Sequence, residues 1–267
     1  MRTKQQYVKG LTKMKRNVYF DGDLIDRTDE RQMPCIETIG TTFDEALRPE
    51  NEGLCTAISH LSGNKISRFT HIHHSKDDLH KKQDMTRMLC QKVGGCIQRC
   101  MGIDATNAIY NASYEADRSN NGATEYHKNF KKWLLRFQNE DLVGCCAQTD
   151  VKGDRMLRPA DQPNPDAYVR IKERLKDGIV VSGCKLHISE ASVADEVLVV
   201  PEADVRRAVA WLLAQEQMVV EGSGAIAIAP LLNGQLRTEA KHIVAVLTGR
   251  NLDTRLLQEI LAEYGSL

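Results

Sequence analysis

Apolar residues recur at helical spacing through the first half of the chain. The series over residues 79–93 predicts a long helix at about 76–92. A second series, over 97–109, predicts a helix at about 94–115. A third helix is predicted to run through the aromatic residues of 133–137. The first half is therefore expected to be mainly helical.

From Leu142 onward, short apolar runs are broken by clusters of turn residues, which is typical of a β domain. After Ser189 the pattern alternates between strand and helix, as in an α/β unit. The elements predicted in this half are strands at 179–181, 197–200 and 243–247, an amphipathic helix at 205–213, a helix opening after Gly222, and a closing helix at 252–264.

Composition narrows the classes of protein that remain. The 267 residues are 42% hydrophobic and 27% charged, which predicts a folded globular chain. The 36 basic side chains balance the 36 acidic ones, so neither nucleic acid nor an anionic membrane surface is expected as a partner. The apolar runs at 225–232 and 243–247 are far shorter than the roughly 20 residues that a bilayer requires. With no secretory h-region, a cytoplasmic location is expected, in which the eight cysteines stay reduced.

Cys96 and Cys100 are the cysteines whose spacing suggests chemistry. Four residues apart on a helix, they would share one face and could bind one metal ion or one edge of a cluster. A reduced pair packed in the core is the alternative, since cysteine is among the most buried residue types. Core packing is the interpretation for Cys90, Cys145 and Cys146, which have no recognised spacing.

Five segments in the first two thirds of the chain occur in the order found in one enzyme family. They are ISRFTHIHHSKDDL, MLCQKVGGCIQRCMGIDATNAIYNASYEAD, EYHKNF, TDVKGDR and DGIVVSGCKLH. Over about residues 5–188 the chain resembles the 4-hydroxybutyryl-CoA dehydratases, relatives of the 4-hydroxyphenylacetate hydroxylases. The resemblance implies an acyl-CoA-dehydrogenase-like fold with a helical domain followed by a β domain.

The same resemblance implies FAD, a [4Fe-4S] cluster and an acyl-CoA substrate. Cys96 and Cys100 match two cluster ligands of the family, and Gln98 matches a glutamine near the substrate. The implied reaction removes an unactivated β-hydrogen, with the flavin as radical partner and the cluster as Lewis acid. The family's other two ligands, a histidine and a cysteine, belong to a part of the family that these segments do not reach. We therefore expect an incomplete site of doubtful activity.

Two further segments match the flavin side of the family. The matching residues are Thr149, Asp150, Lys152, Gly153, Asp154 and Arg155 in a loop, and Lys185, His187 and Ser189 on a strand. Glycine permits close approach of the backbone, and cationic groups suit phosphate. Without the resemblance, an ordinary charged turn is the alternative for the loop.

Histidines form a short run at His71, His73 and His74. Flanked by lysine and aspartate, this run is expected to be a solvated surface segment, and we assign it no metal. His127 is expected to be a structural histidine.

The last 75 or so residues carry a second resemblance. The segments VADEVLVVPEADVRRAV, VVEGSGAIAIAPLL and IVAVLTGRNLD are similar to the end of the pyridoxal-phosphate-dependent serine/threonine ammonia-lyases. Thr248 matches the residue facing the pyridine nitrogen of PLP, and Glu221 matches the start of a helix beside that site. Arg250 and Pro230 depart from the family pattern. The Schiff-base lysine and the phosphate loop belong to a part of that family without a match here, so this site is also expected to be incomplete.

The sequence thus predicts an α+β chain with three parts. Residues 1–140 are expected to form an acyl-CoA-dehydrogenase-like helical domain, 141–190 a partial flavin-side β domain, and 191–267 a partial α/β segment of the fold-type-II PLP kind. The leading hypothesis for function is a flavin and iron-sulfur acyl-CoA dehydratase and isomerase. A PLP-dependent ammonia-lyase fragment and an inactive chimera are the alternatives. Because no linker separates the parts near 188–195, unpaired sheet edges and self-association are expected.

Overall fold

The computed structural model of the chain describes residues 1–99, 105–119, 122–154, 157, 161–164, 166–176, 178–199, 213 and 254–264. The chain divides into two compact units. The first comprises Met1–Tyr110, Glu125–Cys146 and Ser189–Leu198. The second comprises Asn111–Thr124, Ala147–Ile188 and Val199–Leu267.

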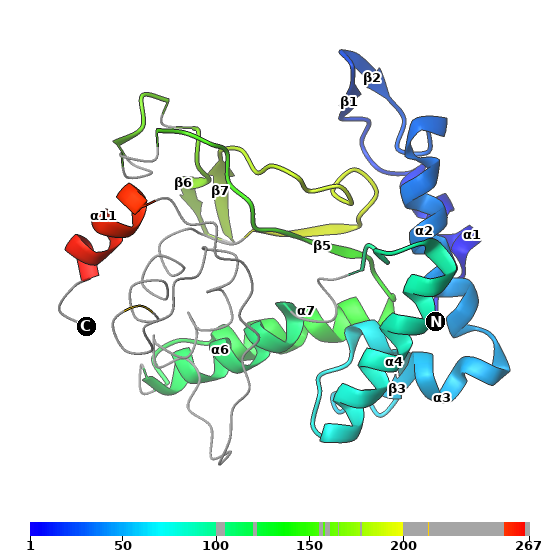
Figure 1. Cartoon of the computed structure of the whole chain (residues 1–267). Helices are drawn as coiled ribbons and strands as arrows, with labels where there is room; N and C mark the ends of the chain where they lie inside the picture. The colour runs from blue at the N-terminus through cyan, green and yellow to red at the C-terminus, as the bar shows by residue number, and fades with distance from the viewer. Residues whose placement is uncertain are drawn as a thin grey trace. The chain divides into compact units, whose positions relative to one another are not determined.

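Helices and short two-stranded sheets build the first unit (Figure 1). Its α-helices are α1 (Lys4–Leu11), α2 (Met33–Ala46), α3 (Glu52–Cys55), α4 (Lys76–Val93), the beginning of α6 (Ala105–Ser119) and α7 (Tyr126–Asn139). Three 3₁₀ helices, η1 (Glu30–Gln32), η2 (Pro49–Asn51) and η3 (Arg68–Thr70), connect them. The strands are β1 (Val18–Phe20) with β2 (Asp23–Ile25), β3 (Thr56–Ile58) with β4 (Lys65–Ser67), and β5 (Gly144–Ala147) with β8 (Glu196–Val199).

Helix α4 begins and ends at residues with strong local signals. The Ser75 hydroxyl accepts a hydrogen bond from the Asp78 backbone, and the Asp78 carboxylate accepts one from the Ser75 backbone, each 3.1 Å long. This reciprocal pair satisfies amide groups that the first turn of a helix leaves unpaired. At the other end, Gly94 adopts a left-handed conformation with φ of 73°. The helix predicted at 76–92 is confirmed, and the prediction for α7 is confirmed as well.

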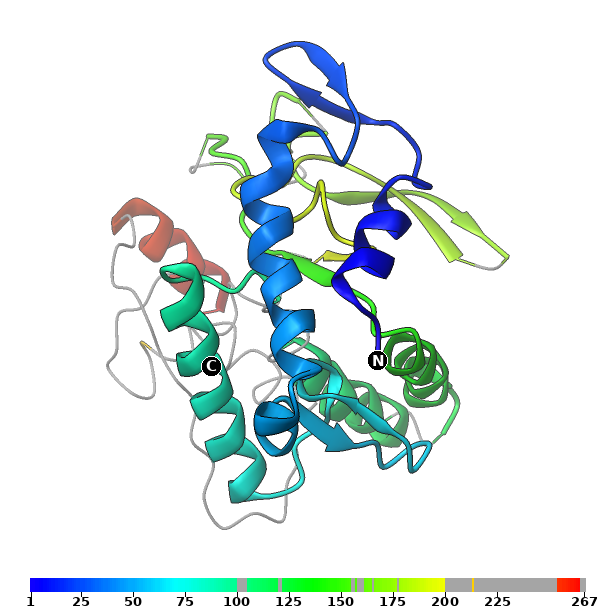
Figure 2. The ribbon, with the colours of Figure 1, turned by 90° about the vertical axis from the view of Figure 1, so that its right-hand side faces the viewer.

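The core of the first unit lies where α2 passes between α1 and α4 (Figure 2). Tyr7 of α1 and Phe43 of α2 contact each other with ring centroids 5.4 Å apart. Each large apolar side chain buried in such a core contributes about 1.5–3 kcal/mol. The side chains buried along these three helices include Tyr7, Leu11, Ile36, Ile39, Phe43, Met85 and Leu89.

The segment between α4 and α6 differs from its prediction. A helix was expected from residue 94, but residues 94–99 are not helical and α6 begins at Ala105. The physical reason is local, because Gly94 has a φ of 73° and Gly95 a φ of 147°, both outside the helical region. The expectation that Cys96 lies on a helix is therefore wrong.

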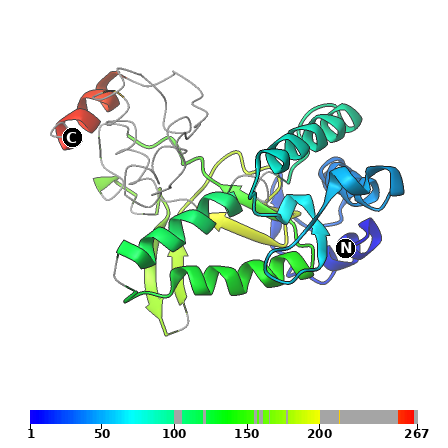
Figure 3. The ribbon, with the colours of Figure 1, turned by 90° about the horizontal axis from the view of Figure 1, so that it is seen from below.

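Strand β8 completes the first unit by pairing with β5. Its Leu198 packs against Phe137 and Leu142, and the Trp133 ring nitrogen donates a 2.6 Å hydrogen bond to the Glu196 carboxylate. Figure 3 shows β8, in yellow, beside α7. A strand was expected at 197–200 as the start of an α/β segment. The strand is present, and it belongs to the sheet that also contains β5.

The second unit contains the antiparallel hairpin of β6 (Arg170–Leu175) and β7 (Gly178–Ser182) and the helix α11 (Thr254–Tyr264). The strand predicted at 179–181 and the helix predicted at 252–264 are confirmed. The helix predicted after Gly222 and the strand at 243–247 lie outside the described residues, as does the helix at 205–213 apart from its last residue.

Helices and strands are both present, as expected for an α+β chain. Among the described residues, none of the helices is long and apolar enough to cross a membrane. The domain boundaries expected at 140 and 190 stay predictions.

Candidate functional site

The loop that follows α4 carries Cys96 and Gln98. Cys96 is exposed, whereas Ile97 next to it is buried in the cluster formed by Met85, Leu89 and Phe69. Cys100 lies outside the described residues. The structure therefore places one cysteine of the predicted pair, on a loop anchored by its neighbour's side chain.

Gln98 has two unusual features. Its φ is 51°, a left-handed value that a residue with a Cβ rarely adopts and that costs on the order of 1 kcal/mol. Its side-chain oxygen Oε1 is buried and has no hydrogen-bond partner among the described residues. An unpaired buried oxygen is costly to a protein unless something outside the described residues completes it. Both features agree with a residue that is held in place to contact a ligand.

The described residues do not provide a site for an iron-sulfur cluster. Within the part of the chain that the structure describes, no three histidine, cysteine, aspartate or glutamate side chains converge as metal ligands. A [4Fe-4S] cluster needs four protein ligands of this kind in most proteins. Of the two predicted ligands, only Cys96 is among the described residues. Cys90, Cys145 and Cys146 are buried or half-buried in the core as expected.

The two segments predicted for the flavin side are brought together in the second unit. Asp150 and Lys185 form an isolated antiparallel bridge, and the Leu186 backbone donates a 2.8 Å hydrogen bond to the Thr149 carbonyl. The Lys185 ammonium lies 2.7 Å from the Asp150 carboxylate and donates a 2.9 Å hydrogen bond to the Gln148 carbonyl. Both charged side chains are at least nine-tenths buried. Lys185 therefore fastens the two segments to each other.

The turn after this bridge presents polar groups outward. Thr149, Lys152 and Asp154 are exposed, while Gly153 lies against the side chain of Gln162. A Cβ added at Gly153 would lie 2.5 Å from the Gln162 Oε1 atom. That amide also bridges the turn, accepting from the Asp154 backbone at 3.0 Å and donating to the Asp154 carbonyl at 2.7 Å.

Sequence reasoning missed Gln162. It expected the glycine to admit a cofactor, and the close neighbour in the structure is this amide. The Asp-Gln-Pro-Asn run at 161–164 offered no recognisable signal for it.

The remaining predicted residues fall in different places. His187 is exposed and has a φ of 58°. Ser189 is exposed and belongs to the first unit, where the Cys35 thiol lies 4.0 Å from its carbonyl oxygen. Arg155, Glu221 and Thr248 lie outside the described residues.

Glu190 is a half-buried residue that the sequence did not single out. Burial raises its pKa to about 7, with the Arg99 guanidinium acting in the opposite direction. Its Oε2 atom is buried with no hydrogen-bond partner among the described residues. The buried Cys145 thiol lies close enough that the Glu190 carboxylate adds to the effect of burial, and the pKa of Cys145 is raised to about 12.

We expect the ionisation of Glu190 to contribute to the pH dependence of the free energy of unfolding. Its folded pKa lies above the unfolded value of 4.5, so the folded state holds the proton more tightly and loses stability as pH rises through about 4.5 to 7. Glu190→Gln is neutral throughout and should be more stable than the wild type at about pH 8 by on the order of 1–3 kcal/mol, with the gain vanishing near pH 4. Urea unfolding at several pH values measures this. The exposed Glu173→Gln is the control, and an equal gain at both ends of the pH range would contradict the expectation.

The histidine run is not the solvated segment that was expected. His71 is only 6% exposed and His73 is half-buried, while His74 is exposed. Desolvation lowers the pKa of His73 to about 4, so this ring is neutral at physiological pH. The segment lies against the start of α4, where His71 contacts Asp78, and local sequence does not reveal this contact.

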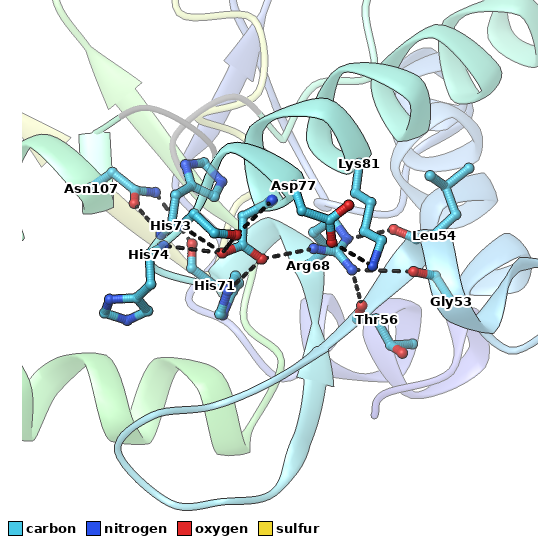
Figure 4. A network of polar contacts seen from close by, with 12 residues as sticks. Gly53, Leu54, Thr56, Arg68, His71, His73, His74, Asp77, Lys81 and Asn107 are labelled. Atoms are coloured by element: carbon cyan, nitrogen blue, oxygen red, sulfur yellow. Dashed lines mark hydrogen bonds and ion pairs between the residues drawn. The ribbon is translucent and has the colours of Figure 1, made fainter. Parts of the chain in front are cut away.

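Figure 4 shows the polar network around this segment. The His71 Nε2 atom lies 3.2 Å from the Asp78 carboxylate, and the His73 backbone donates a 2.8 Å hydrogen bond to Asn107. His127 stacks edge-on against Tyr110, with ring centroids 4.7 Å apart, consistent with a structural role. Within the described residues, the histidines of this network do not belong to any group of three side chains that could hold a metal ion.

Comparison with known proteins finds that the chain is similar to two groups of enzymes. The family described as 4-hydroxyphenylacetate 3-hydroxylase N terminal matches residues 3–211. The chain is 40% identical over 216 residues to a 4-hydroxybutyryl-CoA dehydratase/vinylacetyl-CoA-Δ-isomerase from Clostridium aminobutyricum, covering 78% of this chain and 44% of the relative. An L-threonine ammonia-lyase from Thermotoga maritima is 33% identical over 92 residues, covering 34% of this chain and 23% of the relative.

Solved structures give the same picture of the fold. An oxygen-tolerant archaeal 4-hydroxybutyryl-CoA dehydratase from N. maritimus superposes with a TM-score of 0.70 and 35% identity, covering 75% of this chain and 40% of that one. The oxygenase component of 4-hydroxyphenylacetate 3-monooxygenase, in complex with FAD, has a TM-score of 0.58 at 20% identity, which shows the fold alone. The chain spans less than half the length of the dehydratases that it matches.

Proposed function

The chain belongs, through residues 3–211, to the 4-hydroxyphenylacetate 3-hydroxylase N-terminal family, and from this premise we propose that it carries the flavin-side part of a 4-hydroxybutyryl-CoA dehydratase/vinylacetyl-CoA isomerase-like lyase. The observation that supports the proposal most is the pairing of Thr149 and Asp150 with Lys185 and Leu186. These segments are far apart in sequence, and the family resemblance assigned both to the same cofactor.

We infer that FAD is held at the turn after this bridge. The exposed Thr149 hydroxyl and Lys152 ammonium are the donors that suit flavin carbonyls and phosphate, with His187 as a further exposed donor. Lys185 is neutralised by Asp150, so its role is to lock the two segments together. A bound flavin would supply an acceptor for single electrons and hydrogen atoms.

Gln98 is proposed as a contact for the acyl-CoA substrate. Its buried Oε1 atom is free to accept a hydrogen bond, and its left-handed backbone holds it in one orientation. Cys96 and Cys100 match cluster ligands of the family by position, but the described residues do not assemble a cluster site, and no step is assigned to iron. A complete dehydratase site would need groups that neither unit supplies among the described residues.

The similarity to threonine ammonia-lyases favours a second candidate function for the last third of the chain. Glu221 and Thr248 would lie beside PLP in that case, in a partial α/β domain at about 191–267. With domains at 1–140 and 141–190 before it, the chain would be a chimera of two partial enzymes. Borohydride reduction after mixing with PLP, followed by peptide mapping, distinguishes the candidates. Stoichiometric label on one lysine would support an internal PLP site.

The proposed flavin site is tested by titrating the protein with FAD and following flavin fluorescence. We expect weak binding, because the proposed donors Thr149 and Lys152 are exposed to solvent. Lys152→Ala should raise the Kd about tenfold, the effect of losing one charge-assisted hydrogen bond. The exposed Lys13→Ala is the control. An unchanged fluorescence signal in the wild type, or equal Kd values for both variants, would refute the flavin site.

Self-association is also proposed. Each sheet among the described residues has only two strands, so outer strand edges stay open to pairing with another copy. Light scattering at several protein concentrations measures it, and a monodisperse monomer would contradict the proposal.

A further inference from the structure

Arg99 is the charged residue next to Gln98, and it is almost completely buried at 3% exposure. Its guanidinium donates a 3.0 Å hydrogen bond to the Asp141 carboxylate, which is equally buried. It also donates to the Thr42 hydroxyl and to the Leu142 carbonyl, each at 3.2 Å. One side chain thereby connects the loop after α4 to α2 and to the segment between α7 and β5.

Two aromatic rings complete the enclosure of this cation. The Arg99 guanidinium lies 4.6 Å from the ring centroid of Phe43 and 4.9 Å from that of Phe69. Desolvated contacts between a guanidinium and an aromatic ring are favourable and directional. Because the guanidinium is planar and its donors are fixed, few orientations satisfy these partners together. The backbone at Arg99 is held accordingly, and with it the backbone of Gln98.

The network continues from Asp141 to the segment that follows residue 192. The second Asp141 oxygen accepts a 3.2 Å hydrogen bond from the Arg2 backbone. The Arg2 guanidinium binds both oxygens of Asp195, at 2.6 and 3.3 Å. Asp195 in turn accepts from the Val143 backbone and donates its own backbone amide to the Val143 carbonyl, both at 2.8 Å. Positive and negative groups alternate along this path.

We propose that Arg99 is a positioning residue. Its buried guanidinium is hydrogen-bonded to Asp141, Thr42 and Leu142, and this holds Gln98 and Cys96 in place. The proposal rests on the proposed function only for the role of Gln98 as a substrate contact. This positioning explains why Gln98 keeps a left-handed backbone conformation, since the hydrogen bonds of the Arg99 guanidinium and its contacts with two aromatic rings fix the backbone there. Arg99 itself acts through its neighbours.

The test separates positioning from stability. Arg99→Met alone would leave Asp141 buried and unpaired, so the protein could simply unfold. The double variant Arg99→Met with Asp141→Asn removes both charges together, and asparagine tolerates the left-handed φ of 48° at residue 141. The matched control is Lys65→Met with Glu52→Gln, an ion pair 2.5 Å long in which both side chains are exposed.

Hydrogen exchange with peptide resolution is the measurement, supported by the alkylation rate of Cys96 mapped by mass spectrometry. We expect the double variant to melt cooperatively, while amides of residues 94–99 exchange at least about tenfold faster and those of α4 and α7 change less than about twofold. The Cys96 alkylation rate should change in the double variant and stay constant in the control.

Two results would overturn the inference: wild-type exchange at 94–99 in the double variant, or equal acceleration in every peptide, which indicates a purely global role. Neither readout requires FAD, iron or an acyl-CoA. If the chain fails to bind FAD but the double variant shows faster exchange at residues 94–99, the proposed function is contradicted and the positioning role is supported.

Discussion

A chain that ends after residue 188 is expected to lose the cooperative unfolding of the first unit, whereas a chain that ends after residue 199 keeps it. Residues 189–198 belong to that unit and supply β8, which is the partner of β5. They also supply Asp195 to the Arg2 ion pair and the Val193 carbonyl to the buried Tyr7 hydroxyl, at 2.8 Å. Removing one partner of a buried ion pair costs about 3–5 kcal/mol, and here the loss of a strand is added.

Circular dichroism melts and urea titrations of the two chain lengths measure this difference. Asp195→Asn in the full chain is the matched smaller change, expected to destabilise by part of that amount. The exposed Asp77→Asn is its control, since Asp77 forms an exposed pair with Lys81. Identical melting of both chain lengths would show that residues 189–198 are not part of the first unit.

Replacing Arg68 is expected to destabilise the first unit by about 3–5 kcal/mol, the range for uncompensated buried charge pairs and their partners. The Arg68 side chain is 4% exposed, and its guanidinium donates to the carbonyls of Leu54, Gly53 and Thr56 at 2.6, 3.2 and 2.6 Å (Figure 4). In Arg68→Met these three carbonyls lose the guanidinium donor, and the Asp78 carboxylate loses an ion pair with a separation of 3.6 Å. Buried carbonyls without donors are strongly unfavourable.

Lys81→Met is the control for that variant, because Lys81 is exposed and its ion pair with Asp77 is 2.7 Å long at the surface. Surface pairs of this kind contribute roughly 0–1 kcal/mol. Urea unfolding of both variants decides the matter. A loss of stability in Arg68→Met no larger than in Lys81→Met would contradict the role assigned to Arg68.

Part of the candidate site could be predicted from sequence and part could not. The resemblance to the dehydratases singled out Thr149, Asp150 and Lys185 before any contact between their segments was visible, and the structure brings them together. The resemblance did not reveal that Lys185 forms an ion pair with Asp150, or that the Gln162 side chain is hydrogen-bonded to the turn at Asp154. Pairing between distant segments depends on the whole chain, and single motifs do not encode it.

By itself, the sequence determined those elements whose signals are local. Helix α4 has a serine cap before it and a glycine after it, α7 has its aromatic face, and β7 has an apolar run after a turn. Caps, turns and amphipathic faces act over one or two turns of chain, so a short stretch of residues specifies them.

Only the tertiary structure decided how distant segments were used. It placed β8 against β5, buried His71 against Asp78 of α4, and held Gln98 in a left-handed conformation beside the enclosed Arg99. Burial and charge pairing depend on groups that are far apart in sequence, such as Arg99 with Asp141 and Arg2 with Asp195. A buried guanidinium is stable only where folding brings hydrogen-bond acceptors to it. The local sequence around the arginine or around its partner does not show that the two will meet.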